Sequence, residues 1–141
     1  MGSVLRSIGA VLVGFVAASA VMMLVEFANG HLLYPDLGRA AAGVRDQHEM
    51  AELMAKAPAG AMVVVLVGWI LGSFVGGWVA TRVAGRSSMR PGLVVGGLLT
   101  LAGVANNLMI PPPLWFWVAG LAVMLPLAWL GAKKALSPSL G

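Results

Sequence analysis

Six polar residues lie within or beside the apolar stretches of this chain, and their side chains could do chemistry together. One apolar stretch ends in a carboxylate followed by three further polar groups, and a later stretch ends in two consecutive asparagines. An ionisable group inside an apolar segment is costly to bury and usually faces protein or water, so it is a candidate site for a cation or a proton. The residues are Glu26, Asn29, His31, Tyr34, Asn106 and Asn107.

Three interpretations of this polar cluster are open. In the first, it is structural: Glu26 reaches interfacial water, or the asparagine amides hold it and fix the helices. In the second, it is the ion or proton site of a small transporter, because a carboxyl group shielded from water can exchange a proton. In the third, it is a metal site, in which Glu26 or His31 joins three residues of the following loop, His48, Glu49 and Glu52.

The metal interpretation depends mainly on His48 and Glu52, which stand at positions i and i+4 and can share one helix face. Metal ligands are sometimes arranged in this way. The chain has no HExxH pattern, and its two histidines with scattered carboxylates form a weak ligand set. We therefore predict neither a resident metal nor a cofactor.

The chain carries no pattern of enzyme chemistry. It contains no cysteine, which excludes disulfides, thiolate ligands and cysteine nucleophiles. No nucleophilic triad, phosphate-binding loop or nucleotide fingerprint occurs in it. The nine basic residues are spread over several connections, so the net charge of +4 does not indicate a nucleic-acid partner. The sequence predicts a protein that is not an enzyme.

Composition predicts the elements that must position the cluster. Apolar residues make up 60% of the 141 residues, and charged residues only 10%. Soluble domains average about 45–50% apolar and about 25% charged residues, and a domain of about 150 residues buries only roughly 70% of the surface its unfolded chain exposes. This apolar excess predicts an all-α integral membrane protein whose main partner is the lipid bilayer.

Charged residues and prolines divide the chain into four predicted membrane spans. Uncharged stretches run over 7–25, 57–81 and 91–132, and the last is interrupted by prolines at 111–113. Consecutive prolines cannot continue a helix. A span needs about 20 apolar residues to cross the hydrocarbon of a bilayer. We predict one membrane domain over residues 1–141, a four-helix bundle with spans near 4–28, 60–83, 91–109 and 113–132.

The connection at about 30–58 is the only long one, and it is predicted to carry an amphipathic helix. Residues 46–49, Asp-Gln-His-Glu, resemble a capping box with Asp in the first position. Met50, Leu53 and Met54 follow as an apolar stripe. This helix is expected to lie on the membrane surface or to cap the bundle.

Lysines and arginines predict the direction of the spans, because basic residues accumulate on the cytoplasmic side. Six fall on the side of both termini and three in the long connection. Both termini are therefore predicted to lie in the cytoplasm, with the long connection on the opposite side of the membrane. The two sets are Arg6, Arg82, Arg86, Arg90, Lys133 and Lys134, and Arg39, Arg45 and Lys56.

Glycines at intervals of four residues predict close helix packing. They are Gly68, Gly72 and Gly76 in the second span and Gly92 and Gly96 in the third. Lipid supplies no hydrophobic drive for helix association, so close packing of small residues must supply the attraction. The pattern, that of a glycine zipper, is explained either by the folding of one bundle or by a seam with a second copy or a partner membrane protein.

Two segments carry a resemblance. Residues 68–78 read GWILGSFVGGW and are followed by Thr81-Arg82, and residues 106–117 read NNLMIPPPLWFW. They resemble small, uncharacterised bacterial inner-membrane proteins with four helices. The resemblance covers most of the chain from the second span onward; it implies a four-helix bundle and brings no assigned activity. Small multidrug resistance transporters are similar in size and span number, but their first-helix glutamate lies near mid-span.

These observations lead to an ordered set of functional predictions. The first is a small non-enzymatic membrane protein that acts as a homo-oligomer or as an accessory subunit of a larger membrane assembly. The first alternative is a small-solute or proton-coupled ion transporter that uses Glu26. The second alternative is a metal-binding membrane protein.

Overall fold

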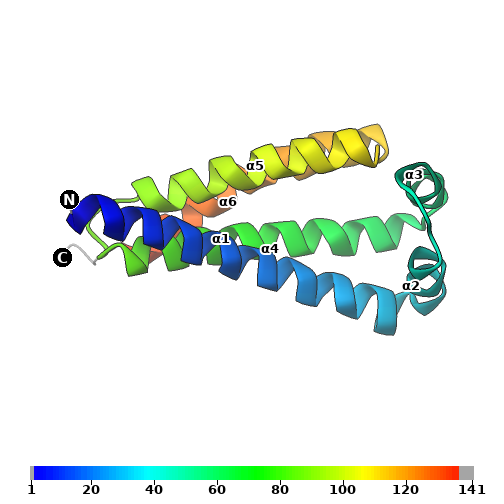
Figure 1. Ribbon diagram of the computed structural model, residues 1–141, viewed down its shortest axis with the longest axis horizontal. Helices are drawn as coiled ribbons and strands as arrows, with labels where there is room; N and C mark the ends of the chain where they lie inside the picture. Colours follow the sequence, from blue (N-terminus) through cyan, green and yellow to red (C-terminus); the bar gives the residue numbers. More distant parts are fainter. Residues whose placement is uncertain (1, 137–141) are drawn as a thin grey trace.

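Apolar sequence bounded by prolines forms four long helices, which run side by side (Figure 1). The computed structural model describes residues 2–136, which contain helices and no strand. All four helices are long and apolar enough to cross a membrane. The predicted spans overlap them throughout, and the fourth helix extends three residues further than predicted. The long helices are α1 (Gly2–Ala28), α4 (Ala59–Val83), α5 (Arg90–Met109) and α6 (Leu114–Ala135).

Prolines mark where three of these helices begin. Pro58 and Pro113 occupy the N-cap positions of α4 and α6, and Pro91 lies in the first turn of α5. Proline is favoured at the start of a helix because its fixed φ suits the helix and its missing N–H would be unpaired there. The proline run at 111–113 therefore ends one helix and starts the next, as predicted.

A glycine ends α4. Gly85 has φ +111°, a conformation that favours glycine because it has no Cβ. The N–H of Arg86 donates to the carbonyl of Thr81 at 2.9 Å, and the N–H of Gly85 donates to the carbonyl of Arg82 at 3.2 Å. These two hydrogen bonds form a Schellman motif. The chain turns sharply here and enters α5.

The glycines of α4 face α1 within the same chain. A Cβ added at Gly72 would lie 2.8 Å from the carbonyl oxygen of Ala18, and one at Gly76 would lie 3.0 Å from that of Gly14. A Cβ added at Gly68 would lie 3.1 Å from the side chain of Val25 on α1. The backbones of α1 and α4 therefore approach more closely than side chains larger than hydrogen would allow.

The glycines of α5 face α4 and α6. A Cβ at Gly92 would lie 2.8 Å from the carbonyl oxygen of Gly77 on α4, and one at Gly96 would lie 2.7 Å from the Cβ of Ala128 on α6. Within the described residues, each of the five predicted packing glycines thus contacts a helix of its own chain.

The long connection contains more helix than predicted. α1 continues into a π-helical turn, η1 (Asn29–Leu33), closed by a hydrogen bond from the N–H of Tyr34 to the carbonyl of Asn29 at 2.7 Å. Two short helices follow, α2 (Pro35–Ala42) and α3 (Gln47–Ala55). The prediction of a single helix missed both η1 and α2.

The predicted capping box is formed in part. The Oδ1 of Asp46 accepts a hydrogen bond from the N–H of Glu49 at 2.9 Å, as an N-cap does. The carboxylate of Glu49 accepts from the N–H of Arg45 at 2.9 Å, where a capping box would use the N–H of Asp46. α3 therefore begins where predicted, with a shifted reciprocal bond.

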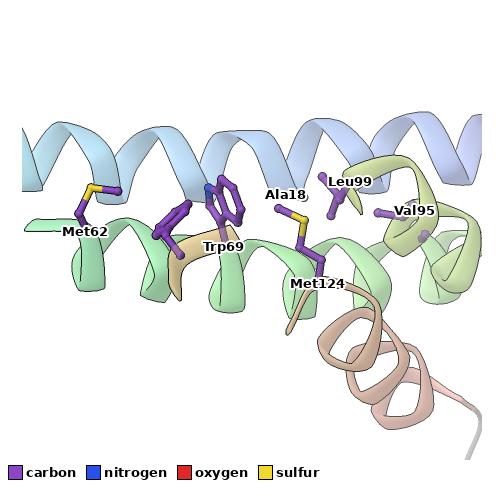
Figure 2. Packing of buried hydrophobic residues seen from close by; sticks show 8 residues of the cluster. Ala18, Met62, Trp69, Val95, Leu99 and Met124 are labelled. Atoms are coloured by element: carbon purple, nitrogen blue, oxygen red, sulfur yellow. The ribbon is translucent and has the colours of Figure 1, made fainter. Parts of the chain in front are cut away.

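Large buried side chains from α4, α5 and α6 form one cluster along the bundle. Figure 2 shows Met62, Trp69, Met124 and Leu99 following one another along these helices, with Val95 beyond them. Val95 is fully buried and also approaches Gly14 and Gly76. At this level α1, α4 and α5 meet.

Candidate functional site

A cavity of about 480 Å³ lies between the long helices at the end of the bundle that carries α2 and α3. Figure 1 shows these short helices crossing that end, opposite the first residues of α1. The short helices contribute to the cavity lining through Leu37 and Ala41 of α2 and through Met50 and Met54 of α3. We call this space the loop-end cavity. Its polar lining consists of Glu26, Asn29, Asn106 and Asn107.

Asn107 is the most unusual group in the loop-end cavity. It lies in the last turn of α5 and is 0% exposed. Neither its Nδ2 nor its Oδ1 has a hydrogen-bond partner among the described residues. Buried polar groups are nearly always paired, and an unpaired one costs about 1–3 kcal/mol, so this amide is a costly feature within the bundle.

Asn29 presents a second incompletely paired amide. It is the first residue of η1 and is 7% exposed. Its Nδ2 donates to the carbonyl of Ala61 on α4 at 3.1 Å, while its Oδ1 has no partner within residues 2–136. The amide is thus held in place from one side, and its Oδ1 lies buried behind the wall of the cavity that the residue lines.

Glu26 and Asn106 line the loop-end cavity where it opens. Both residues are exposed, and they belong to α1 and α5, respectively. The two helices meet near Val95 and separate toward the loop end, as Figure 1 shows. Glu26 and Asn106 are therefore exposed parts of the cavity lining, and Asn107 belongs to its buried wall.

His31 and Tyr34, which were predicted to join the cluster, do not line this cavity. The ring of His31 is exposed and stacks on Phe27, with 4.1 Å between ring centroids, and its Nδ1 lies 3.0 Å from the carbonyl oxygen of Phe27. The hydroxyl of Tyr34 lies against Gly60 at the start of α4. The chain stays helical through η1, so His31 is carried to the face of Phe27 and away from Asn29.

The apolar lining was not recognised from the sequence. Trp69 and Phe116 meet edge to face, with 4.9 Å between ring centroids. Unbranched methionine side chains adapt to differently shaped partners, and the chain contains nine methionines, a signal that was available. Those that line the loop-end cavity are Met22, Met50, Met54, Met62 and Met124.

The weak metal candidates form an exposed ion pair. The Nε2 of His48 lies 3.2 Å from Oε1 of Glu52, and both side chains are more than half exposed. No group of three or more potential ligands occurs in the part of the chain that the structure describes. His48 and Glu52 also lie outside the loop-end cavity, so they do not join Glu26 in one site.

Comparisons with known proteins supply no relative for this chain: no family model, no curated protein and no solved structure matches it. The function is therefore inferred from the geometry of its own residues.

Proposed function

We propose that this chain spans the inner membrane of a bacterium four times and carries small amphipathic cations through the loop-end cavity. The four long apolar helices support the membrane location. Large apolar side chains along them are exposed, among them Leu12, Val16 and Leu101, each more than 60% exposed. Contiguous exposed apolar surface of this kind suits contact with lipid.

The buried, unpaired amide of Asn107 carries the solute-binding part of the proposal. Both polar atoms of this amide are closed to water, so a solute that brings its own donor and acceptor would pair with them once the side chain turns toward the cavity that it lines. Asn29 offers a further acceptor from the facing helix turn. Together the two amides would orient the polar head of the solute.

Charge and apolar lining define the proposed class of solute. Glu26 is the only charged residue among those described that lines the loop-end cavity, so its field favours a cation over an anion. The methionines and the rings of Trp69 and Phe116 suit an apolar body, and an aromatic face also attracts a positive charge. A small organic cation with an aromatic or aliphatic body fits both features.

The route proposed for the solute follows from where the helices meet. The exposed polar residues of the lining are Glu26 on α1 and Asn106 on α5, and Val95 contacts Gly14 and Gly76 further toward the opposite end of the bundle. Passage toward the other end would require α1 and α5 to part at that level. Transport therefore needs a second conformation of the bundle.

The accessory or oligomeric role predicted first has less support from the geometry. It was motivated by the glycine faces, and Gly68, Gly72 and Gly76 already pack against α1 of the same chain. A partner or a second copy would have to use a different face. The cavity needs no partner to form its lining.

The solute-binding proposal is tested with ethidium, an aromatic cation, and the purified protein in detergent. We expect Glu26→Gln to weaken ethidium binding about tenfold, a loss of about 1.4 kcal/mol. Glu52→Gln is the matched control, because it removes one acidic charge at the same end from a residue outside the cavity. Equal binding by both variants would refute the role of Glu26.

Asn107→Leu separates a binding role from a structural one. Leucine has a similar shape and no polar atoms, so removing the unpaired amide should raise the free energy of unfolding by about 1–3 kcal/mol while ethidium binding is lost. An amide that held the bundle together would give a less stable variant. In liposomes, ethidium uptake should depend on the same two residues as binding does.

The proposed topology is tested with single cysteines, because the chain has none of its own. A membrane-impermeant maleimide should label Arg45→Cys, between α2 and α3, in intact spheroplasts. Ser87→Cys, between α4 and α5, should be labelled only after lysis. The reverse pattern would place the termini outside.

A further inference from the structure

A second cavity, of about 880 Å³, lies at the opposite end of the bundle, between the beginnings of α1 and α5. Two arginines and several serine hydroxyls line it, and apolar side chains continue the lining along both helices. We call it the basic cavity. Its polar lining includes Arg6, Arg90, Ser3, Ser7, Ser87 and Ser88.

The charge at this end of the molecule is entirely positive. The five acidic residues of the chain all occur between positions 26 and 52, on the last turn of α1 or in the long connection. The ion pairs found within residues 2–136 are confined to that connection. No side-chain carboxylate within residues 2–136 therefore neutralises the arginines of the basic cavity.

Most basic side chains at this end already have another contact. The Nε of Arg6 donates to the carbonyl of Val83 at 3.2 Å, and the Nε of Arg86 donates to that of Ala135 at 3.1 Å. Arg82 lies over the ring of Trp78, 4.7 Å from its centroid. The Nζ of Lys133 lies over the ring of Trp129, 5.0 Å from its centroid.

Arg90 differs from these residues. Its side chain is exposed and lines the basic cavity, and it has no such contact among the described residues. Its backbone N–H donates to the hydroxyl of Ser88 at 3.2 Å, at the first turn of α5. The positive end of the α5 dipole therefore adds to the two guanidinium groups.

We propose that the basic cavity binds the phosphate group of an anionic phospholipid. The guanidiniums of Arg6 and Arg90 supply fork-shaped donors that match phosphate oxygens, and the serine hydroxyls supply further donors. Basic pockets between transmembrane helices bind anionic headgroups in this way.

The apolar part of the same cavity selects a lipid over free phosphate. Ile8 and Leu12 of α1 and Val94 of α5 line it and are each about half exposed or more. They lie between about half a turn and nearly two turns along their helices from Arg6 and Arg90, in the direction of the loop end. A phosphate held by the arginines would therefore place its acyl chains along this groove between α1 and α5.

The test compares retention of phosphatidylglycerol and phosphatidylcholine by the detergent-purified protein in native mass spectrometry. We expect wild type to retain phosphatidylglycerol preferentially. In Arg90→Gln the ratio of retained phosphatidylglycerol to phosphatidylcholine should fall about fivefold, because one basic residue near an anionic surface contributes about that much. Arg82→Gln removes an equal charge at the same end, from a residue outside the cavity, and should change the preference less than twofold.

Three outcomes overturn the proposal. The first is equal retention of the two lipids by wild type. The second is an equal loss of the preference for phosphatidylglycerol in Arg90→Gln and Arg82→Gln, which would mean general charge attraction. The third is an equal rise of the melting temperature with inorganic phosphate and with phosphatidylglycerol, which would mean a free-phosphate site. The melting temperature of each variant in phosphatidylcholine alone checks that it is folded.

Discussion

Alanine substitutions at two neighbouring glycines of α5, Gly96 and Gly97, measure how closely the helices pack. A Cβ added at Gly96 would lie 2.7 Å from the Cβ of Ala128 and 2.9 Å from Cδ1 of Leu125. Non-bonded carbons prefer about 3.5–4.0 Å, so α5 and α6 would have to separate by about 1 Å. A Cβ at Gly97 would meet nothing within 4 Å.

The expected effect is the difference in free energy of unfolding between Gly96→Ala and Gly97→Ala. Both substitutions replace glycine by alanine on one helix, and the gain in helix propensity, about 0.8–1.0 kcal/mol, is common to both. Overpacking a close contact costs about 1–3 kcal/mol. We therefore expect Gly96→Ala to have a free energy of unfolding about 1–3 kcal/mol below that of Gly97→Ala.

The assay is unfolding by sodium dodecyl sulfate, followed by circular dichroism, for wild type and both variants in the same non-ionic detergent. Gly97→Ala should be as stable as wild type or more stable. Free energies of unfolding of Gly96→Ala and Gly97→Ala that agree within about 0.5 kcal/mol would refute the argument, because that is the usual accuracy of such differences.

Three further substitutions test single elements. Gly85→Ala puts a Cβ at φ +111° and should cost about 1–2 kcal/mol in the same unfolding assay; a neutral result would contradict the Schellman turn. Asp46→Ala removes the acceptor for the N–H of Glu49 and should weaken α3 by about 1 kcal/mol, seen as faster amide exchange over 47–55 with α4 unchanged. Trp69→Ala empties a buried position against Phe116 and should cost about 3–5 kcal/mol; a loss below about 1 kcal/mol would mean that the ring is not buried.

The long helices were predictable because their limits depend on local chemistry. Charges cannot lie cheaply inside an apolar helix, and prolines cannot continue one, so both mark boundaries directly in the sequence. α2 was missed because it is only eight residues long with Gly38 inside it, and so short a helix is marginal on its own. It is held by tertiary contact: a Cβ at Gly38 would collide with the backbone of Gly30 in η1.

The candidate site was predictable in part. Glu26 and the asparagines at 29, 106 and 107 line one cavity because α1 and α5 run in the same direction and place them at similar depth. His31 and Tyr34 were misplaced because the chain was expected to leave the helix after residue 28, whereas η1 continues it. The five methionines of the lining come from four different helices, α1, α3, α4 and α6, and no local pattern links them.

The sequence alone determined which segments are helical and apolar, where they end and at which end basic residues gather, since each depends on residues close together in the chain. Only the tertiary structure decided that Asn107 is buried without a partner among the described residues and that a cavity lies at each end of the bundle. The physical reason is helix spacing. Whether a polar group finds a partner, and whether a gap stays open, depends on how closely Gly14, Gly76 and Val95 bring three separate helices together.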